Sequence, residues 1–478
     1  MTKNSIKLDP TPKHSLSPWL YMQFMEPLGS TDGAVEAAWD HRNDKWFDCV
    51  IEKSREIAPP LMRWGGILSA YYRWREAVGP RDKRVPMLNY LWGGIETNQI
   101  GTGEFLDFCE KIKADAFFCV NFLSEGKQCY AMGPHGEVRT AGPEEAAEWV
   151  DYCNNPFNKE RISHGRVRPY NVKLWQLGNE TSYKFLEDGF TVEESGIHTV
   201  EFAKAMRAVD PELKFIGWGD SGWAPRLLEI AGEHIEYVAF HQGPVPEQKE
   251  LLNDGEYTKD WDRSWALMMT AYKATEKKIQ EMREQVAGSG KYLAMTEGHM
   301  GFKGHNRGNV QSTSMIGVAY ARALNVHERN GDILKIATAA DYCGTRWMNN
   351  ALMINHPSKV AYLMPVAHVM SLYRRHSGES LIESKSTSGD LDITASITGN
   401  KAYIHVVNIN KDKAVKAELS VAGKTVKSGK VFQLKAEPSF EIMITTRDDL
   451  KVEEIDMQKP DSWTFPAGSV SAVELELE

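Results

Sequence analysis

The strongest constraint on the fold is a repeated alternation of short apolar runs with longer helical stretches. Eight apolar runs lack polar alternation, which is typical of strands buried on both faces. The expected strands span residues 19–26, 60–64, 115–122, 172–178, 214–220, 235–241, 291–297 and 334–342. Helical stretches, among them 260–286 and 359–373, separate or follow these runs. The pattern predicts an α/β fold, a (β/α)8 TIM barrel over residues 18–375.

The C-terminal part of the chain has a different sequence pattern. Over residues 376–478, short β-rich runs are separated by Gly, Asn, Lys and Asp, which predicts an antiparallel β-sandwich. We expect residues 1–17 to add a strand to this second domain. A doubly wound sheet is the structural alternative, but no G-x-G-x-x-G follows any of the predicted strands.

Composition narrows the partners and the location. The 56 Lys and Arg against 65 Asp and Glu give a net charge of -9, which disfavours nucleic acid as the main partner. We find neither a long apolar run that predicts a membrane segment nor the apolar core of an N-terminal secretory signal. The 6 cysteines form no C-x-x-C pair, which is typical of reduced thiols. We therefore expect a cytoplasmic protein without a membrane partner.

Two carboxylates end strands that lie opposite each other in the predicted barrel. Glu180 follows the fourth strand and Glu297 ends the seventh, at the face where barrel enzymes carry their chemistry. In a retaining glycosidase, one carboxylate attacks the anomeric carbon while the other protonates the leaving oxygen and then activates water. Asn179 offers an amide for the sugar hydroxyl beside the reacting carbon. The alternative for either glutamate alone is a salt bridge to a loop.

The motif W-x-L-G-N-E at residues 175–180 carries a family resemblance. With SPWLYMQFMEPLG, PPLMRWGG, the long RWREAVGPRDKRVPMLNYLWGGIETNQIGTGEFLDFCE and VAFHQ, it makes the chain similar to glycoside hydrolase family 51, the α-L-arabinofuranosidases. The resemblance implies a retaining hydrolase that needs no cofactor and no metal. It also implies a homo-oligomer acting on plant- or algal-type oligosaccharides.

Carried over by residue, the resemblance makes Glu180 the general acid/base and Glu297 the nucleophile. It further implies a set of residues that line the sugar site or support this pair. They are Glu26, Arg63, Trp92, Asn179 and His241. Polar residues at the predicted strand ends and one arginine of the Y-Y-R-W segment complete the expected substrate-binding set. They are Gln242, His299, Asp341 and Arg73.

The sequence departs from the family at positions that recognise the sugar. The family typically has Asn at Arg73, Tyr at Gly243, Trp at Gly298 and Gln at Asp341. Other retaining specificities therefore stay open: an endo-glycanase, a galactofuranosidase or an enzyme that accepts a uronate. Under the last hypothesis Arg73 grips the uronate carboxylate. The alternative is that Arg73 forms a salt bridge with Asp341 or Glu26 across the pocket rim.

Two interpretations lie outside glycoside hydrolysis. Imidazole and carboxylate groups suit a divalent metal, as in barrel sugar isomerases, although no H-x-H or H-E-x-x-H spacing occurs. The candidate ligands are Glu180, His241, Glu297, His299 and His305. The other interpretation is a barrel that binds sugar without cleaving it, which the missing Tyr and Trp near the nucleophile would fit.

Overall fold

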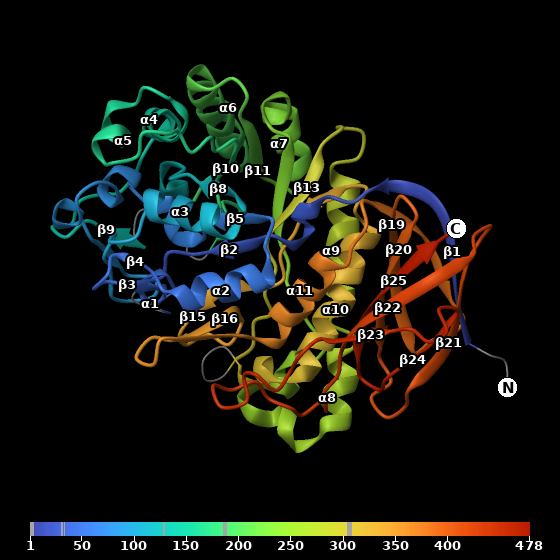
Figure 1. Cartoon of the computed structure of the whole chain (residues 1–478). Helices are drawn as coiled ribbons and strands as arrows, with labels where there is room; N and C mark the ends of the chain where they lie inside the picture. The colour runs from blue at the N-terminus through green and yellow to red at the C-terminus, as the bar shows by residue number, and fades with distance from the viewer. Residues whose placement is uncertain (1–3, 30–31, 33, 128–129, 185–188, 304–307) are drawn as a thin grey trace.

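The computed structural model describes residues 4–29, 32, 34–127, 130–184, 189–303 and 308–478. Figure 1 shows an N-terminal barrel, coloured blue to yellow, beside a C-terminal sheet in orange and red. Of the helices in the described part of the chain, none combines the length and apolarity needed to cross a bilayer.

The barrel is a parallel sheet whose strands follow one another in chain order. Its strands are β2 (Gln23–Met25), β5 (Leu61–Trp64), β8 (Asp115–Cys119), β10 (Leu174–Leu177), β11 (Lys214–Trp218), β12 (Tyr237–His241), β13 (Tyr292–Glu297), β14 (Leu334–Ile336) and β15 (Asp341–Gly344). The predicted eighth strand is split: β14 pairs with β13, whereas β15 pairs with β2. The backbone N–H of Ala337 donates to the carbonyl of Trp19 at 3.0 Å and helps to close the barrel.

Adjacent residues of one strand show why the runs do not alternate. Phe117 packs with Phe24 and Ile216 inside the barrel, whereas its neighbour Phe118 packs in the layer between barrel and helices. Both phenylalanines are 0% exposed. Because helices cover the outer face, each strand has two apolar faces and loses its polar alternation.

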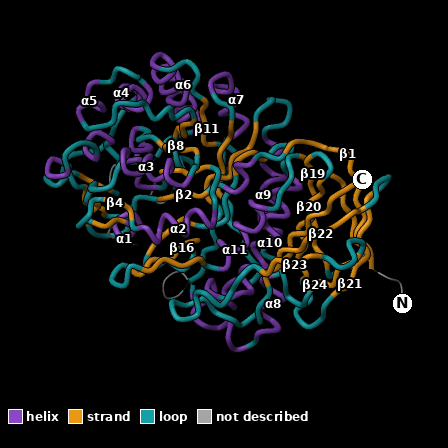
Figure 2. Tube along the Cα trace, viewed as in Figure 1, coloured by secondary structure: helices purple, strands orange, loops and turns teal. Residues whose placement is uncertain are grey.

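Helices surround the strands on the outside (Figure 2). They are α2 (Asp48–Ile57), α3 (Thr102–Ile112), α4 (Pro143–Asn154), α6 (Val192–Val209), α7 (Ala224–Ala231), α8 (Trp261–Met268), α9 (Tyr272–Gln285), α10 (Ser314–Arg329) and α11 (Pro365–Arg375). The prediction of one helix over 260–286 is wrong, because a turn separates α8 from α9. The prediction over 359–373 is wrong at its start: β17 (Val360–Leu363) pairs with β16 (Asn350–Asn355), and Pro365 then begins α11.

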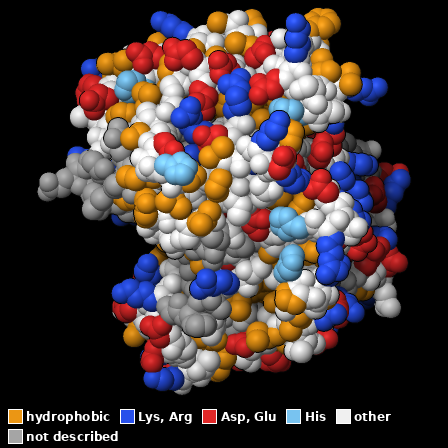
Figure 3. Space-filling model, turned by 90° about the vertical axis from the view of Figure 1, so that its left-hand side faces the viewer, with side chains coloured by type: hydrophobic (Ala, Val, Ile, Leu, Met, Phe, Trp, Pro, Cys, Tyr) orange, Lys and Arg blue, Asp and Glu red, His pale blue; other side chains and the backbone are white. Residues whose placement is uncertain are grey.

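A small antiparallel sheet is inserted between β5 and α4. It consists of β6 (Met87–Asn89), β7 (Ile95–Glu96) and β9 (Ala131–Met132). On the face drawn in Figure 3, acidic, basic and hydrophobic side chains are interspersed.

The C-terminal strands join one nine-stranded sheet. They are β18 (Ser380–Ser386), β19 (Leu391–Thr398), β20 (Lys401–Asn408), β21 (Val415–Val421), β22 (Val426–Leu434), β23 (Glu453–Asp456), β24 (Ser462–Phe465) and β25 (Val470–Leu477), with β1 (Asn4–Ser15). The pairs are antiparallel except for β1 with β21, which is parallel. Ile6, Leu419 and Val473 come from distant strands and share one core, so the sheet folds over itself.

Candidate active site

The two predicted catalytic carboxylates meet at the carboxyl ends of the barrel strands. Glu297 is the last residue of β13, and Glu180 lies on the turn that follows β10. One carboxylate oxygen of each and a ring nitrogen of His241 all lie within 4.8 Å of one another. Retaining glycosidases hold their carboxyl groups about 5–5.5 Å apart, and inverting enzymes about 6.5–9.5 Å. The upper limit of 4.8 Å between these oxygens lies below the inverting range and next to the retaining one.

Arg63, on β5, organises the base of the site. Its side chain is 0% exposed, and its guanidinium donates from Nη1 to Oε1 of Glu297 at 2.9 Å. It also donates from Nη2 to Oδ1 of Asn179 at 2.5 Å and from Nε to Oε1 of Gln176 at 2.9 Å. The guanidinium therefore supplies a buried counter-charge to Glu297 and fixes the Asn179 amide.

Glu180 has a different environment. Burial raises the pKa of Glu180 to about 6, and the nearby positive charge of Arg63 opposes that rise. Its Oε1 lies 2.9 Å from Nδ1 of His241. Burial also lowers the pKa of His241 to about 4, so the imidazole is neutral where Glu180 titrates. Glu180 thus has the property that a general acid needs near neutral pH.

The His241 ring is held on two sides. Nε2 lies 2.9 Å from Oγ1 of Thr296, and the ring meets Trp218 edge-on at 4.6 Å between centroids. Because a neutral imidazole carries one N–H, one ring nitrogen donates while the other accepts between Glu180 and Thr296. His241 therefore orients the Glu180 carboxyl.

Asn179 presents a buried donor without a partner among the described residues. Its side chain is 0% exposed, and its Oδ1 accepts from Arg63. Its Nδ2 is buried and makes no hydrogen bond within the described part of the protein. Buried polar atoms are almost always paired, so such a donor suits a ligand hydroxyl.

Two other predicted substrate residues contact each other. Nδ1 of His299 lies 2.8 Å from Oδ1 of Asp341, and Asn349 donates from Nδ2 to the second oxygen of Asp341 at 3.0 Å. The backbone N–H of Gln242 donates to the carbonyl of Glu297 at 3.2 Å. Gln242 follows β12, His299 follows β13 and Asp341 begins β15, beside the carboxylate pair.

Trp92 and Glu26 lie on loops of the same barrel end. Trp92 is 41% exposed and meets Trp347 edge-on at 5.5 Å between ring centroids. Glu26 lies against Gly66, where an added Cβ would come within 2.1 Å of the Glu26 carboxyl carbon. With φ at 148°, Gly66 leaves both the space and the backbone conformation that this contact requires.

Arg73 corrects one expectation. Its Nε donates to both carboxylate oxygens of Glu145 on α4, at 2.8 and 3.0 Å, so the predicted bridge to Asp341 or Glu26 is wrong. The reason is local: Trp74 also donates from Nε1 to the carbonyl of Glu145, which directs this segment toward α4. The Nε donor of Arg73 is thus already bonded to a carboxylate, and the uronate hypothesis gains no support.

Sequence reasoning missed two buried ionisable residues behind Asn179. Oε1 of Glu125 accepts the Asn179 backbone N–H at 2.6 Å, and Lys127 donates from Nζ to the Glu180 carbonyl at 3.2 Å. Their side chains are 1% and 2% exposed. Only their place just after the third predicted strand could have drawn attention to them.

Two family departures have a steric cause. A Cβ on Gly243 would lie 1.8 Å from the carbonyl oxygen of His299. A Cβ on Gly298 would lie 2.3 Å from the carbonyl oxygen of Thr338. The backbone of neighbouring segments therefore fills the space that the Tyr and Trp side chains would need.

The metal alternative keeps three of its candidate ligands. Glu180, His241 and Glu297 converge as a metal site would require. However, Glu297 already accepts from Arg63, and His299 contacts Asp341 instead. His305 lies outside the described residues.

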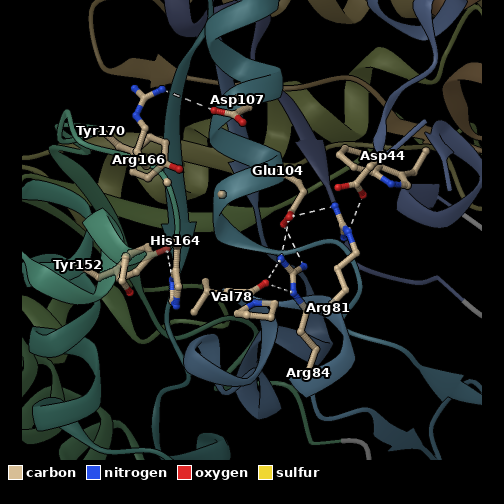
Figure 4. A pocket seen from close by; sticks show the side chains of 16 residues that line it. Asp44, Val78, Arg81, Arg84, Glu104, Asp107, Tyr152, His164, Arg166 and Tyr170 are labelled. Atoms are coloured by element: carbon tan, nitrogen blue, oxygen red, sulfur yellow. Dashed lines mark hydrogen bonds and ion pairs between the residues drawn. The ribbon is translucent and has the colours of Figure 1, made fainter. Parts of the chain in front are cut away.

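A separate pocket of about 640 Å³ lies on the outer side of the barrel, beside α3 (Figure 4). Its arginines are paired: Arg84 with Glu104 at 2.7 Å and Arg81 with Asp44 at 2.6 Å. None of the predicted site residues lines it. The internal pairing of its charges indicates a structural role.

The barrel and its carboxylate pair define the class, a (β/α)8 protein of the glycoside hydrolase type. Residues 53–263 match the family description "Alpha-L-arabinofuranosidase 1 domain", and residues 304–469 match "Alpha-L-arabinofuranosidase C-terminal domain". The chain belongs to the α-L-arabinofuranosidase family, glycoside hydrolase family 51.

Curated relatives match over part of their length. The chain is 30% identical over 239 residues to an "Intracellular exo-alpha-(1->5)-L-arabinofuranosidase" of Acetivibrio thermocellus, covering 47% of this chain and 44% of that protein. It is 37% identical over 215 residues to "Alpha-L-arabinofuranosidase C" of Emericella nidulans, covering 43% and 40%. The matched part of the chain therefore spans less than half the length of these relatives.

Solved structures match over the whole chain. The family 51 α-L-arabinofuranosidase of Thermotoga petrophila RKU-1 superposes with a TM-score of 0.80 at 24% identity, covering 99% of this chain and 100% of that one. The enzyme of Xanthomonas axonopodis pv. citri gives 0.84 at 18% identity, with the same coverage. These matches confirm the predicted barrel with its C-terminal sheet domain.

Proposed function

We propose that the protein is a retaining α-L-arabinofuranosidase acting on arabinose-containing oligosaccharides. The observation that carries the proposal is the closely spaced carboxylate pair with two unlike environments. Arg63 contacts Glu297 at 2.9 Å, whereas Glu180 contacts the neutral His241 at 2.9 Å. The activities named for the relatives support the sugar.

The proposed reaction has two displacements. A carboxylate oxygen of Glu297 attacks the anomeric carbon, the bond to the leaving oxygen breaks, and Glu180 gives its proton to that oxygen. In the second step Glu180 takes a proton from water, the water oxygen attacks the anomeric carbon, and the ester to Glu297 breaks. The Asn179 amide donates to the hydroxyl beside that carbon, and Arg63 stabilises the released Glu297 carboxylate.

The names of two relatives support an intracellular setting. These two, from Acetivibrio thermocellus and Halalkalibacterium halodurans, are named intracellular enzymes. Under this proposal the substrate is a short imported oligosaccharide rather than a polymer outside the cell. The homo-oligomer that the family resemblance implies stays a prediction, which sedimentation of the purified protein tests.

The first test is a panel of aryl glycosides with the wild type and Glu297→Ala. The panel contains the α-L-arabinofuranoside, β-D-galactofuranoside, β-D-xylopyranoside, β-D-glucoside and β-D-glucuronide. We expect turnover of the arabinofuranoside that the substitution abolishes, with a first product of unchanged anomeric configuration by NMR. Faster turnover of another glycoside of the panel would mean that the enzyme acts on that sugar instead. An inverted first product would overturn the retaining mechanism.

A metal-dependent sugar isomerase is the second candidate, because Glu180, His241 and Glu297 converge. It predicts interconversion of an aldose and a ketose that Mn²⁺ or Co²⁺ stimulates and a chelator stops. Glycoside hydrolysis insensitive to the chelator, without isomerisation, would exclude it.

A further inference from the structure

The segment behind the acid/base turn has an unusual backbone. Leu123, Ser124, Glu125 and Gly126 all have positive φ, at 52°, 51°, 55° and 72°. Three of these residues carry a Cβ, for which the left-handed region is unfavourable. Strained backbone of this kind persists only where surrounding contacts hold it, and it clusters at functional sites.

Neighbouring hydrogen bonds hold this left-handed turn. Oδ1 of Asn121 accepts the backbone N–H of Ser124 at 3.1 Å, and the N–H of Leu123 donates to the carbonyl of Ala141 at 3.1 Å. The N–H of Glu125 donates to the carbonyl of Phe122 at 2.8 Å. The turn therefore presents the two side chains at its end in a defined direction.

Those two side chains reach the turn that carries the acid/base residue. Glu125 accepts the backbone N–H of Asn179 at 2.6 Å, and Lys127 donates to the backbone carbonyl of Glu180 at 3.2 Å. Lys127 is itself held, because Tyr71 donates from its hydroxyl to the Lys127 carbonyl at 2.7 Å. The contacts flank the Asn179–Glu180 peptide on both sides.

The gripped turn is strained as well. Glu180 has φ at 57°, and Gly178 before it has φ at 84°. A non-glycine residue in the left-handed region tends to relax toward negative φ, which would swing its side chain away. The Glu180 carboxyl needs its present direction to contact His241 at 2.9 Å.

We propose that Glu125 is a positioning residue for the acid/base carboxyl, holding the strained Asn179–Glu180 turn together with Lys127. The inference rests on the proposed role of Glu180 and adds the device that keeps it aimed. Glu125 influences the substrate only through that turn, because its Oε1 accepts the backbone N–H of Asn179.

The charge state of Glu125 makes Glu125→Gln a matched control for Glu125→Ala. Burial raises the pKa of Glu125 to about 8, against the opposing charge of Lys127, so the carboxyl is uncharged at neutral pH. Glutamine copies that shape and charge and keeps an oxygen for the Asn179 N–H. Alanine removes the oxygen.

The activity test compares leaving groups. At pH 6, Glu125→Ala should lower kcat/KM, which reports the step that forms the glycosyl-enzyme, about 10²-fold on an alkyl arabinofuranoside, whose departure needs a well-placed proton donor. On the 2,4-dinitrophenyl arabinofuranoside, which leaves without a proton, the loss should be at least about tenfold smaller. Glu125→Gln should stay within about threefold of wild type on both.

Equal losses on both substrates, or a folded Glu125→Gln as impaired as Glu125→Ala, would overturn the proposal. If Glu125→Ala does not fold, Lys127→Met carries the same comparison from the other side of the peptide. It should show a smaller loss with the same dependence on the leaving group, and a loss independent of the leaving group would overturn the proposal.

A second arm needs no substrate. Crystal structures of the wild type and Glu125→Ala, or Lys127→Met in its place, should show the Asn179–Glu180 peptide rotated and the contact between Glu180 and His241 broken in the variant. An unchanged turn would overturn the positioning role. If the wild type cleaves no glycoside at all, the proposed function fails, and these structures still decide whether Glu125 holds the turn.

Discussion

The ends of β10 and β13 hold their glutamate side chains in different ways. Glu297 is the last residue of β13, where it pairs with His241 of β12 next to an irregularity in the strand pairing, and its side chain contacts the cation Arg63. Glu180 lies beyond its strand, in a left-handed conformation that the buried side chains of Glu125 and Lys127 hold by the backbone.

The difference fits the roles proposed for the two carboxyls. A nucleophile stays ionised and needs a fixed counter-charge, which a strand end beside a buried arginine provides. A general acid has to gain and lose a proton, so burial beside a neutral imidazole suits it better than a bound cation. Unlike environments therefore assign unlike roles to two identical side chains.

The largest expected effect comes from removing the nucleophile. Glu297→Gln should lower kcat on the aryl arabinofuranoside on the order of 10⁴-fold or more, while its amide oxygen still accepts from Arg63. The melting temperature serves as the control and should stay close to that of the wild type. Activity within tenfold of wild type would refute the assignment of Glu297.

Replacing the acid/base residue should lower activity less than replacing the nucleophile, and it should also change the pH profile of kcat/KM. Glu180→Gln should lower kcat/KM about 10³-fold on substrates with poor leaving groups. In the wild type, kcat/KM should fall as the pH rises through about 6, because the protonated Glu180 is the active form and its pKa is raised to that value. Glu180→Gln should lack this limb, and a wild-type rate that rises through pH 6 would contradict the role.

A substitution of Asn179 tests the hydrogen bond that its amide is proposed to donate to the substrate. Asn179→Ala should lower kcat/KM about 10²-fold, because a hydrogen bond to the hydroxyl beside the anomeric carbon strengthens in the transition state. A substrate lacking that hydroxyl is the matched control and should be cleaved equally by both proteins. An equal loss on both substrates would assign the effect to the freed Arg63 instead.

The smallest effect concerns the backbone packed around the end of β13. Gly243→Ala should lower the free energy of unfolding by about 2 kcal/mol, because the new methyl group meets the carbonyl of His299. Gly301→Ala is the control, since nothing lies within 4 Å of its added Cβ, and it should change stability by no more than about 0.5 kcal/mol. Both are measured by urea denaturation, and equal effects would mean that the loop moves aside.

Sequence patterns were informative where local periodicity decides structure. Strands covered on both faces read as unbroken apolar runs, and a chain of such runs separated by helices closes into a barrel. The strand ends then placed Glu180, Glu297 and Arg63 at one face, where the structure has them. The roles of these residues stay predictions until the variants are measured.

Patterns failed where a distant contact decides. The hypothesis that Arg73 forms a salt bridge across the pocket rim is wrong, because Arg73 and Trp74 both contact Glu145 on α4. Gly243 read as a lost tyrosine, whereas the backbone of His299 leaves no room for any side chain there.

The sequence by itself determined the barrel and the places of its two catalytic candidates, because hydrophobic periodicity and strand ends are local properties. Only the tertiary structure decided which carboxyl meets a cation and which contacts a neutral ring. It also decided that Glu125 and Lys127, more than fifty residues away in the chain, hold the acid's backbone. Such contacts depend on through-space distance and burial, which no pattern along the chain encodes.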